Sequence, residues 1–333
     1  MKKIINDPSS FVDEFVDGIL LAHPDLLKAA TDDRRVLVRA DAPVAGKVGI
    51  VTGGGSGHLP LFKGYVGRGL CDGVAIGNVF SSPSSAQVLE ATKAVSGGAG
   101  VLYLYGNYGG DVFNFDLATD MAELEGISTQ TVLGRDDVAS QPKERKTDRR
   151  GVAGILFAYK AAGAAAERGD SLAQVAAVAE DIIENTATMG IGLSPTILPT
   201  TGKPSFELED GEMEVGIGIH GEPGFLRGAL ETADQIAERL TERLLADLGI
   251  GSGDRVAVLV NGMGATPLEE LYLLYRRVHQ LLAEQGITIE KNYIGEYATS
   301  LEMAGASISL LTLNDERLAL LNAPARSPFF QEA

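Results

Sequence analysis

The sequence predicts an α/β protein made of two α/β domains, each with a mainly parallel or mixed sheet flanked by helices. Three observations indicate this class. Segments typical of buried strands alternate with segments whose apolar residues recur at helical spacing. Many of the 41 glycines stand in short clusters directly after the strand segments, where tight turns are common. A length of 333 residues is sufficient for two domains of ordinary size.

The predicted elements of the first half alternate along the chain. A helix is expected to begin after the serine pair at 9–10, where apolar residues recur at helical spacing. Strands are expected over 48–51, 74–79 and 101–105. The serine cluster at 81–85 predicts the N-cap of a second helix, and another helix follows the third strand.

A change in composition near residue 190 predicts the domain boundary. Two alanine-rich helices are expected over 151–169 and 171–189, and they close a first domain of residues 1–189. The segment 190–204 is rich in Gly, Pro, Ser and Thr, as connecting segments are. Residues 190–333 are therefore expected to form the second domain.

The second domain is predicted to restart with strands. These strands are expected over 215–219, 255–260 and 307–313, where apolar residues run together. A helix with alternating acidic and basic residues on its exposed face is expected over 229–248. A short helix beginning at Asp315 closes the chain.

Composition excludes several classes of protein. A formal net charge of −17 argues against nucleic acid or an anionic membrane as a partner, because both need a basic surface. Cys71 is the only cysteine, so no disulfide can form within the chain and a reducing compartment is expected. No apolar run approaches the roughly 20 residues of a membrane helix, and residues 1–8 do not resemble a secretion signal. We expect a soluble, cytoplasmic protein.

Three residues with ionisable side chains lie in glycine-rich segments that follow predicted strands: His58, Asp111 and His220. In open α/β sheets, ligands bind at the carboxyl ends of the strands. The simpler interpretation is that such segments are turns, that the histidines are structural and that Asp111 caps a helix. Their joint occurrence favours a polar pocket suited to acid/base chemistry on a small polar ligand. A ligand-binding α/β protein without catalysis remains an alternative.

Motifs for nucleotides and metals are absent from the sequence. The pair Gly202-Lys203 is followed by Pro204, which is incompatible with the helix start that a P-loop needs. No dinucleotide-binding fingerprint, C-x-x-C or H-x-x-x-H spacing is present. The segment 53–58 could instead form a backbone cradle for a phosphate or hydroxyl group. No nucleotide cofactor or metal is therefore expected on this chain.

Six sequence blocks, in the same order, resemble the K subunit of dihydroxyacetone kinase, a family that includes the erythrulose kinases. The resemblance covers nearly the whole chain. The blocks are GGGSGH at 53–58, VFSSPS at 79–84, NYGGDVFNF at 107–115, GIHGEPG at 218–224, VNGMGATP at 260–267 and TSLEMAG at 299–305.

The resemblance implies a role for each candidate residue. His220 matches the family's histidine that attacks the ketone carbon and forms a covalent hemiaminal. Asp111 matches the carboxylate that accepts the proton of the substrate hydroxyl, and His58 matches the histidine that hydrogen-bonds the substrate and shares the acid/base role. Gly55, Ser56 and Gly57 match the loop around the substrate. These roles together imply a kinase-type phosphotransferase that acts on a small ketose.

The resemblance also implies partners. A K subunit binds only the sugar, and a separate L subunit carries ATP or ADP with magnesium. The phosphoryl group then comes from ATP or from a phosphocarrier protein, and the K subunit is a homodimer. Some relatives bind the sugar but act as coactivators of a transcription factor. That alternative is less favoured here because His58 and Asp111 are both present.

Three positions depart from the family pattern. Gly106 stands where many relatives have a lysine that contacts the substrate. The loss of that side chain predicts more space, which would admit a four-carbon ketose such as erythrulose as well as dihydroxyacetone. Thr196 stands where a cysteine is common and Glu296 where an asparagine is common, and no function is assigned to either.

Overall fold

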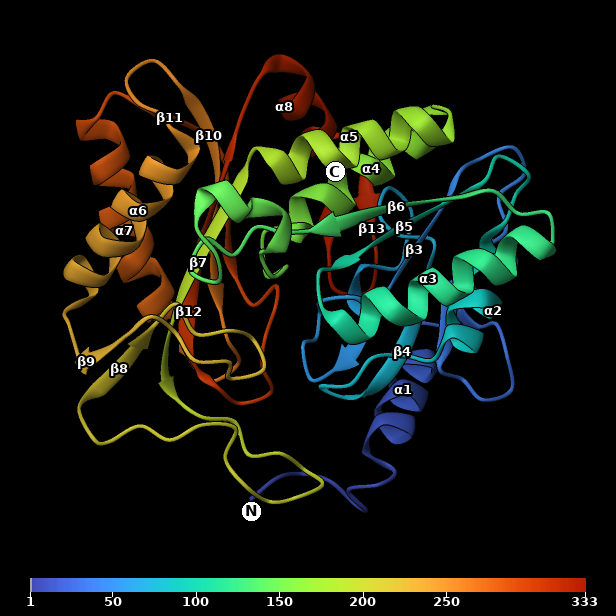
Figure 1. Ribbon diagram of the computed structural model, residues 1–333, viewed down its shortest axis with the longest axis horizontal. Coiled ribbons are helices and arrows are strands. Elements are labelled where there is room, and N and C mark those ends of the chain that lie inside the picture. Colours follow the sequence, from blue (N-terminus) through green and yellow to red (C-terminus); the bar gives the residue numbers. More distant parts are fainter. Residues whose placement is uncertain (1) are drawn as a thin grey trace.

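Two six-stranded sheets with helices between and around them confirm the predicted α/β class. The computed structural model describes residues 2–333. Figure 1 shows the two sheets side by side, with one group of helices between them and one on the far side of each. Within residues 2–333 no helix has the length and apolar character needed to span a membrane.

The first sheet has the strand order β1-β2-β4-β3-β5-β6. Strands β4, β3, β5 and β6 are parallel to one another, whereas β1 and β2 join one edge in antiparallel pairs. The predicted strands at 48–51, 74–79 and 101–105 correspond to β3, β4 and β5. The strand bounds are Leu27–Ala29 (β1), Val36–Arg39 (β2), Gly49–Ser56 (β3), Gly73–Val79 (β4), Val101–Gly106 (β5) and Thr129–Gly134 (β6).

Helices α2 (Ser85–Val95) and α3 (Gly109–Leu124) cover the outer face of the first sheet. The predicted serine cap of α2 is confirmed. The Ser84 hydroxyl accepts from the Gln87 amide nitrogen at 3.3 Å, and the Gln87 side chain accepts from the Ser84 amide at 2.9 Å. This capping box fixes where the chain turns from the end of β4 into the helix.

The second sheet has the strand order β11-β10-β12-β7-β8-β9 and is mixed, since only β10 and β11 pair in parallel. Helices α6 (Ala233–Leu248) and α7 (Leu268–Glu284) cover its outer face. The strand bounds are Thr186–Ser194 (β7), Glu212–Val215 (β8), Leu226–Ala229 (β9), Arg255–Gly262 (β10), Thr288–Gly295 (β11) and Ala304–Thr312 (β12).

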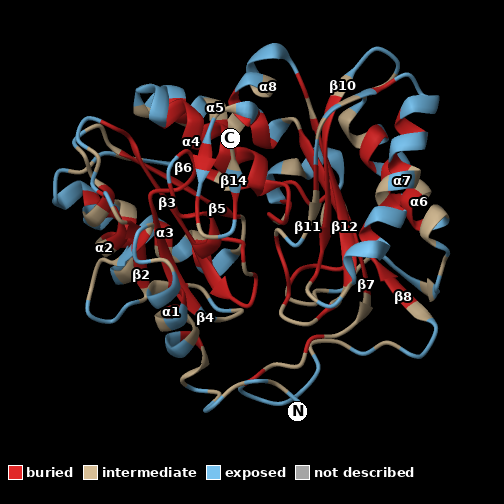
Figure 2. Cartoon of the chain, turned by 180° about the vertical axis from the view of Figure 1, so that it is seen from behind, coloured by how far each residue is buried: buried red, intermediate tan, exposed pale blue. Residues whose placement is uncertain are grey.

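A central layer of helices lies between the sheets and is buried by both (Figure 2). Every residue of α4 from Ile155 to Ala166 is buried. One apolar core contains the apolar residues of this stretch together with Leu102 of the first sheet and Leu259 of the second. The remaining elements are α1 (Phe11–Ala22), α4 (Ile155–Arg168), α5 (Leu172–Glu184), α8 (Asp315–Asn322), the short 3₁₀ helices η1 (Lys63–Tyr65) and η2 (Lys143–Asp148), and a small ribbon of β13 (Ala325–Arg326) with β14 (Gln331–Glu332).

The expected helix over 171–189 is too long at its carboxyl end. Helix α5 ends at Glu184, and Thr186 begins β7, which pairs with β12 and β8 inside the second sheet. The first seven residues of β7 are buried, and three of them are β-branched (Thr186, Thr188 and Ile191), which suits a central strand better than a helix. The expected boundary between residues 189 and 190 therefore falls within β7.

Two other expected elements of the second half also differ. Strand β8 ends at Val215 rather than 219, because Gly216 has φ +82° and turns the chain out of the sheet. The expected helix over 229–248 begins only at Ala233, where Thr232 caps it, and Leu226–Ala229 forms the edge strand β9.

Candidate active site

The candidate residues of the first half lie at one edge of the first sheet. His58 follows β3, Phe80 follows β4, Gly106 ends β5 and Asp111 lies in the first turn of α3. These three strands are adjacent and parallel, so their carboxyl ends share an edge. His220 comes from the loop after β8, in the other half of the protein, and its ring meets that of His58. The site therefore lies between the two sheets.

Aromatic rings enclose the two histidines. The centroids of His58 and His220 are 4.8 Å apart with an interplanar angle of 76°. Phe80 stacks on His58 with centroids 4.9 Å apart, and the Tyr108 ring meets the His220 ring edge to face at 4.8 Å. These rings fix the orientation of both imidazoles and exclude water from their sides.

His58 is fully buried, and its hydrogen bond determines its tautomer. The Nδ1–H group donates to the Thr299 carbonyl at 2.7 Å, so Nε2 carries the lone pair. Nε2 is buried and has no hydrogen-bond partner among residues 2–333. Burial, and then the charge of His220, lower the pKa of His58 well below its usual value. His58 is therefore a neutral hydrogen-bond acceptor at neutral pH.

His220 is held by a carboxylate two residues further along the chain. Its Nδ1–H donates to Oε1 of Glu222 at 2.7 Å, and its backbone N–H donates to Oε2 at 3.0 Å. Burial alone would raise the pKa of Glu222, but the hydrogen bond and charge of His220 outweigh it and set this pKa to about 2. The ionised carboxylate orients the ring and leaves the lone pair of Nε2 free for nucleophilic attack.

Asp111 supplies a buried carboxyl group with a free oxygen. The residue is 8% exposed, and Oδ1 has no hydrogen-bond partner within residues 2–333. Burial raises its pKa to about 6, against the opposing effects of the Ser82 hydroxyl and the charge of His220. A carboxylate with a pKa near 6 is largely ionised at pH 7 and is still basic enough to accept a proton from a hydroxyl group that is losing it.

The glycines at 53–55 do not form the loop that the sequence predicted. They lie in β3, and close packing explains them. A Cβ atom on Gly54 would lie 2.4 Å from the Phe62 ring, and one on Gly55 would lie 2.7 Å from the Ser81 amide nitrogen. The Ser56 hydroxyl is buried and donates its proton to the Gly77 carbonyl at 2.8 Å, so that proton is not free to bind a ligand.

Gly57 and Gly106 shape the walls of the site. Gly57 has φ +108°, and a Cβ there would lie 2.6 Å from the Phe80 ring, so only glycine lets that ring reach His58. A Cβ on Gly106 would lie 3.1 Å from the Tyr108 ring, whose hydroxyl donates to the Gly151 carbonyl at 3.0 Å. Tyr108 therefore borders the space that a longer side chain at position 106 would take.

The other two unusual positions lie apart from the histidines. The hydroxyl of the buried Thr196 donates to Oε2 of Glu302 at 2.7 Å, which is a structural role. Glu296 lies against Gly262, where burial raises the pKa of its carboxyl group. Nothing in the structure connects either side chain to His58, Asp111 or His220.

Several site residues were not singled out by sequence reasoning. Glu222 had a local signal, since it stands two residues after His220 in the same loop. Phe80 and Tyr108 had the weaker signal of following a strand. Thr299 opens the block at 299–305, but nothing in the sequence linked it to His58, which lies 241 positions away and donates its Nδ1 proton to the Thr299 carbonyl.

Comparison with known families decides what this arrangement belongs to. The family model described as the Dak1 domain matches residues 17–329. The chain belongs to the Dak1 domain family. This membership confirms the resemblance that the sequence blocks indicated.

Relatives of this Dak1 domain carry kinase names. The chain is 44% identical over 331 residues to the dihydroxyacetone-binding subunit DhaK of PTS-dependent dihydroxyacetone kinase 2 from Listeria innocua, with 99% of each chain covered. It is 42% identical to the DhaK subunit of the PEP-dependent dihydroxyacetone kinase from Escherichia coli, with 98% of each covered. It is 43% identical to an L-erythrulose kinase from Pectobacterium atrosepticum, of which it covers 56%.

Solved structures extend the comparison to the fold. The dihydroxyacetone kinase of C. freundii superimposes with a TM-score of 0.92 at 31% identity, over 99% of this Dak1 domain and 60% of that chain. The dihydroxyacetone kinase operon co-activator Dha-DhaQ superimposes with a TM-score of 0.89 at 32% identity, over 96% and 98% of the two chains. A kinase and a co-activator thus share this fold.

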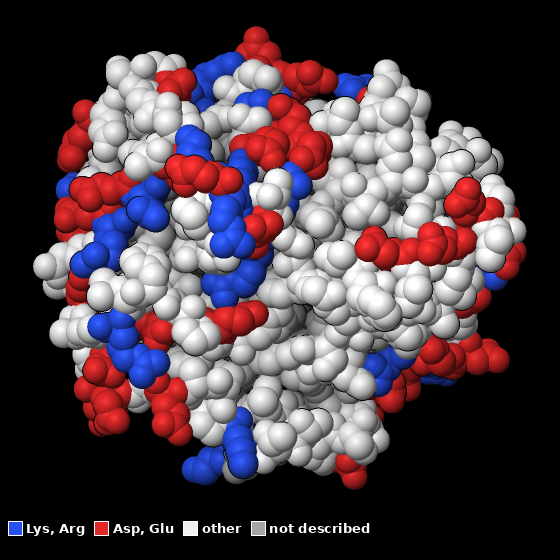
Figure 3. Space-filling model, in the orientation of Figure 1, with Lys and Arg blue, Asp and Glu red and all other residues white. Residues whose placement is uncertain are grey.

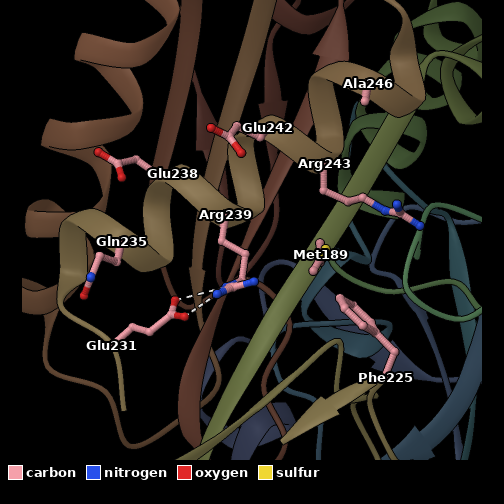
Figure 4. A pocket seen from close by; sticks show the side chains of 9 residues that line it. All are labelled: Met189, Phe225, Glu231, Gln235, Glu238, Arg239, Glu242, Arg243 and Ala246. Atoms are coloured by element: carbon pink, nitrogen blue, oxygen red, sulfur yellow. Dashed lines mark hydrogen bonds and ion pairs between the residues drawn. The ribbon is translucent and has the colours of Figure 1, made fainter. Parts of the chain in front are cut away.

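A separate hollow of about 660 Å³ lies along α6. Figure 4 shows Arg239 turned toward Glu231, with which it pairs, and Arg243 turned away from both. Six of its nine lining residues belong to α6, four of them charged, and Glu231, Met189 and Phe225 complete the lining. None of the residues His58, Asp111 or His220 lines it, so it is distinct from the candidate active site.

Proposed function

We propose that this Dak1 domain binds a short-chain ketose, dihydroxyacetone or a tetrulose such as erythrulose, as a hemiaminal on His220. It then presents a hydroxyl group of the ketose for phosphorylation by a separate L subunit. The observation that carries this proposal is the pair of hydrogen bonds between His220 and Glu222, which leaves Nε2 as a free nucleophile.

The covalent step follows from that geometry. The Nε2 lone pair of His220 forms a bond to the carbonyl carbon, and the C=O pair moves to oxygen, which takes up a proton from water. The ring becomes positively charged, and the adjacent Glu222 carboxylate stabilises that charge. The ring keeps its Nδ1 proton, which stays hydrogen-bonded to Glu222, so formation of the adduct takes up one proton from solvent overall.

This chemistry selects substrates by reaction as well as by shape. A carbonyl carbon accepts attack by a nitrogen lone pair, whereas the carbons of an alcohol such as glycerol do not. The covalent bond also fixes the position of the hydroxyl group that will react, which gives the orientation that efficient transfer requires.

Asp111 and His58 have separate roles in the proposal. Asp111 accepts the proton of the reacting hydroxyl group as the phosphoryl group arrives, because Oδ1 is unpaired and its pKa is about 6. His58 accepts a hydrogen bond from the bound ketose at Nε2, the nitrogen that has no protein partner. A neutral His58 beside His220 also avoids repulsion with the charged ring of the intermediate.

The phosphoryl donor is proposed to lie on the L subunit, with ATP or ADP and magnesium bound there. A phosphocarrier protein could recharge that nucleotide. Helix α3, which carries Asp111 in its first turn, offers a docking face for the partner. The exposed apolar side chains along α3 are Phe113, Leu117, Met121 and Leu124. In Figure 3 most Lys and Arg side chains of the visible face lie on the other half of the molecule, away from α3.

A second candidate function is a ketose-binding coactivator of transcription. The structural likeness to Dha-DhaQ favours it, with a TM-score of 0.89. Such a protein needs His220 but has no use for a base that accepts a hydroxyl proton. The unpaired, buried Asp111 therefore favours the kinase subunit. Turnover with an L subunit and ATP distinguishes the two, because a coactivator gives none.

Native mass spectrometry tests the covalent step. Incubation with dihydroxyacetone or erythrulose should add one ketose mass to the protein, and His220→Ala should abolish the adduct. His279→Ala, which removes an exposed histidine of α7, is the matched control and should keep the adduct. An adduct of undiminished intensity in His220→Ala would refute the assignment of His220.

A further inference from the structure

A second pocket, of about 720 Å³, lies behind the segment that carries His58. Gly57 and Leu59, the neighbours of His58, line it, as does Thr299. Helix α1 forms another wall with the apolar side chains of Phe11, Phe15 and Ile19. The volume is within the range of about 300–1,000 Å³ that is typical of sites for small molecules.

Lys63 in this pocket is a buried lysine without a polar partner. It is 2% exposed, and its Nζ lies 5.1 Å from the centroid of the Phe15 ring. Nζ makes no hydrogen bond or ion pair with any residue in 2–333. The other two buried lysines are both paired. Lys47 pairs with Asp72 at 2.6 Å, and Lys160 donates to the Leu320 carbonyl at 2.9 Å.

A charged amine that is buried without a partner loses hydration and raises the free energy of the folded state. This loss lowers the pKa of Lys63. Burial, and then the charge of Arg35, lower this pKa to about 7. A ligand that brings one negative charge to the amine would compensate for the lost hydration. The structure thus contains an apolar cavity with one amine that lacks a counter-charge.

The polar groups around the pocket have mostly one sign. Lys2, Lys3 and His23 line it beside Lys63, and Glu302 is the only acidic residue among the lining residues. Glu302 pairs with Lys3 and accepts a hydrogen bond from Thr196, so the charges of Lys3 and Glu302 offset each other and Lys2 and Lys63 supply the remaining positive charge. A basic cavity on a chain with a formal net charge of −17 indicates an anionic ligand.

We propose that this pocket binds an aliphatic monocarboxylate, with the carboxylate paired to Lys63 and the alkyl chain against Phe11, Phe15 and Ile19. A single buried amine balances a single charge, which favours a carboxylate over a phosphate dianion. The apolar wall of α1 favours an alkyl chain over a sugar. This site is distinct from the ketose site, because neither His220 nor Asp111 lines it and no step of the proposed phosphorylation uses Lys63.

Calorimetric titration of the whole chain with sodium octanoate tests the proposal. The expected result is binding of one octanoate per chain, with octan-1-ol weaker because it cannot pair with Lys63. Lys63→Met keeps much of the side-chain volume and removes the charge. It should weaken octanoate binding at least tenfold and leave octan-1-ol binding unchanged within twofold. Lys160→Met, a buried lysine outside the pocket, should bind octanoate like the unaltered protein.

A variant that fills the pocket with a larger side chain keeps the proposal testable if Lys63→Met does not fold. Gly18 lies on α1 and lines the pocket, and a Cβ there meets nothing within 4 Å. Gly18→Leu should therefore fold and should block both octanoate and octan-1-ol. The proposal is overturned if the unaltered protein does not bind octanoate, or if Gly18→Leu or a folded Lys63→Met binds it as the unaltered protein does.

Discussion

The imidazole rings of His58 and His220 lie 4.8 Å apart, and each Nδ1–H donates to an oxygen at 2.7 Å. The two acceptors differ in charge. His58 donates to a neutral backbone carbonyl, whereas His220 donates to the ionised carboxylate of Glu222. Only the second arrangement stabilises a positive ring, so His220 is the better nucleophile and His58 the neutral hydrogen-bond acceptor.

Glu222→Gln should weaken the ketose adduct without abolishing it. The amide can still accept the Nδ1–H bond, but it no longer supplies the charge that stabilises the ring. Hydrogen bonds to charged groups contribute about 1.5–3 kcal/mol, so the adduct equilibrium constant should fall roughly 10- to 100-fold. Native mass spectrometry across a range of ketose concentrations measures this constant. Glu231→Gln, which removes one charge from a pair with Arg239 outside the site, should leave it unchanged.

Phosphorylation should depend on pH through Asp111. Its carboxyl group, with a pKa of about 6, must be ionised to accept the hydroxyl proton. The rate with L subunit and ATP should therefore be low at pH 5 and rise to a plateau above pH 7. Asp111→Asn should keep the ketose adduct and lose turnover at every pH. Near-normal turnover in this variant would exclude Asp111 as the base.

The same carboxyl group should lower stability at neutral pH. Its pKa is raised from 3.8 to about 6 in the folded chain, so the folded state binds the proton more tightly than the unfolded state. The stabilisation is complete below pH 3.8 and is lost as the pH rises toward 6. Asp111→Asn should therefore increase the free energy of unfolding at pH 7, by about 3 kcal/mol at most. Chemical denaturation at pH 7 and pH 4 would measure this, with a smaller gain expected at pH 4.

Gly106→Ala tests whether this position controls ketose size. The added Cβ would lie 3.1 Å from the Tyr108 ring and push it against His220. The adduct constant for erythrulose should fall at least fivefold relative to that for dihydroxyacetone. Gly109→Ala is the matched control, because a Cβ there meets nothing within 4 Å. Equal losses for both ketoses would show that the substitution disturbs the site without selecting for size.

The apolar face of α3 should be needed for the L subunit but not for the ketose. In the double variant Phe113→Gln/Leu117→Gln, the concentration of L subunit that gives half-maximal turnover should rise at least tenfold. The ketose adduct should be unaffected. Leu21→Gln, which removes an exposed apolar side chain of α1, should behave like the unaltered protein. An unchanged requirement for L subunit would remove α3 as the docking face.

Local patterns were sufficient to predict much of the fold. Strands β3, β4 and β5 are short runs of apolar residues bounded by glycine or serine, and α2 has a complete capping box. The same strand ends identified His58 and Asp111 as candidate site residues. The end of α5 was missed because the turn at Asn185 joins a helix to a buried strand without a glycine or proline to mark it.

Contacts between distant residues could not be predicted. The Thr299 carbonyl accepts the hydrogen bond that sets the tautomer of His58, although Thr299 lies 241 positions later in the sequence. The glycines of β3 were expected to expose backbone amides, but the rings that pack on them, such as Phe62 on Gly54, belong to later segments. Sequence spacing shows where glycine occurs, whereas the packing partner explains why it is needed.

Burial of α4 from Ile155 to Ala166 leaves the two sheets without a hinge between them. Swinging one sheet away from the other would expose the core that Leu102 and Leu259 share with α4. Rigid closure of two lobes around a ligand is therefore too costly for this architecture. The side chain of His220 is 24% exposed, so a small molecule can reach it from the surface without such a closure.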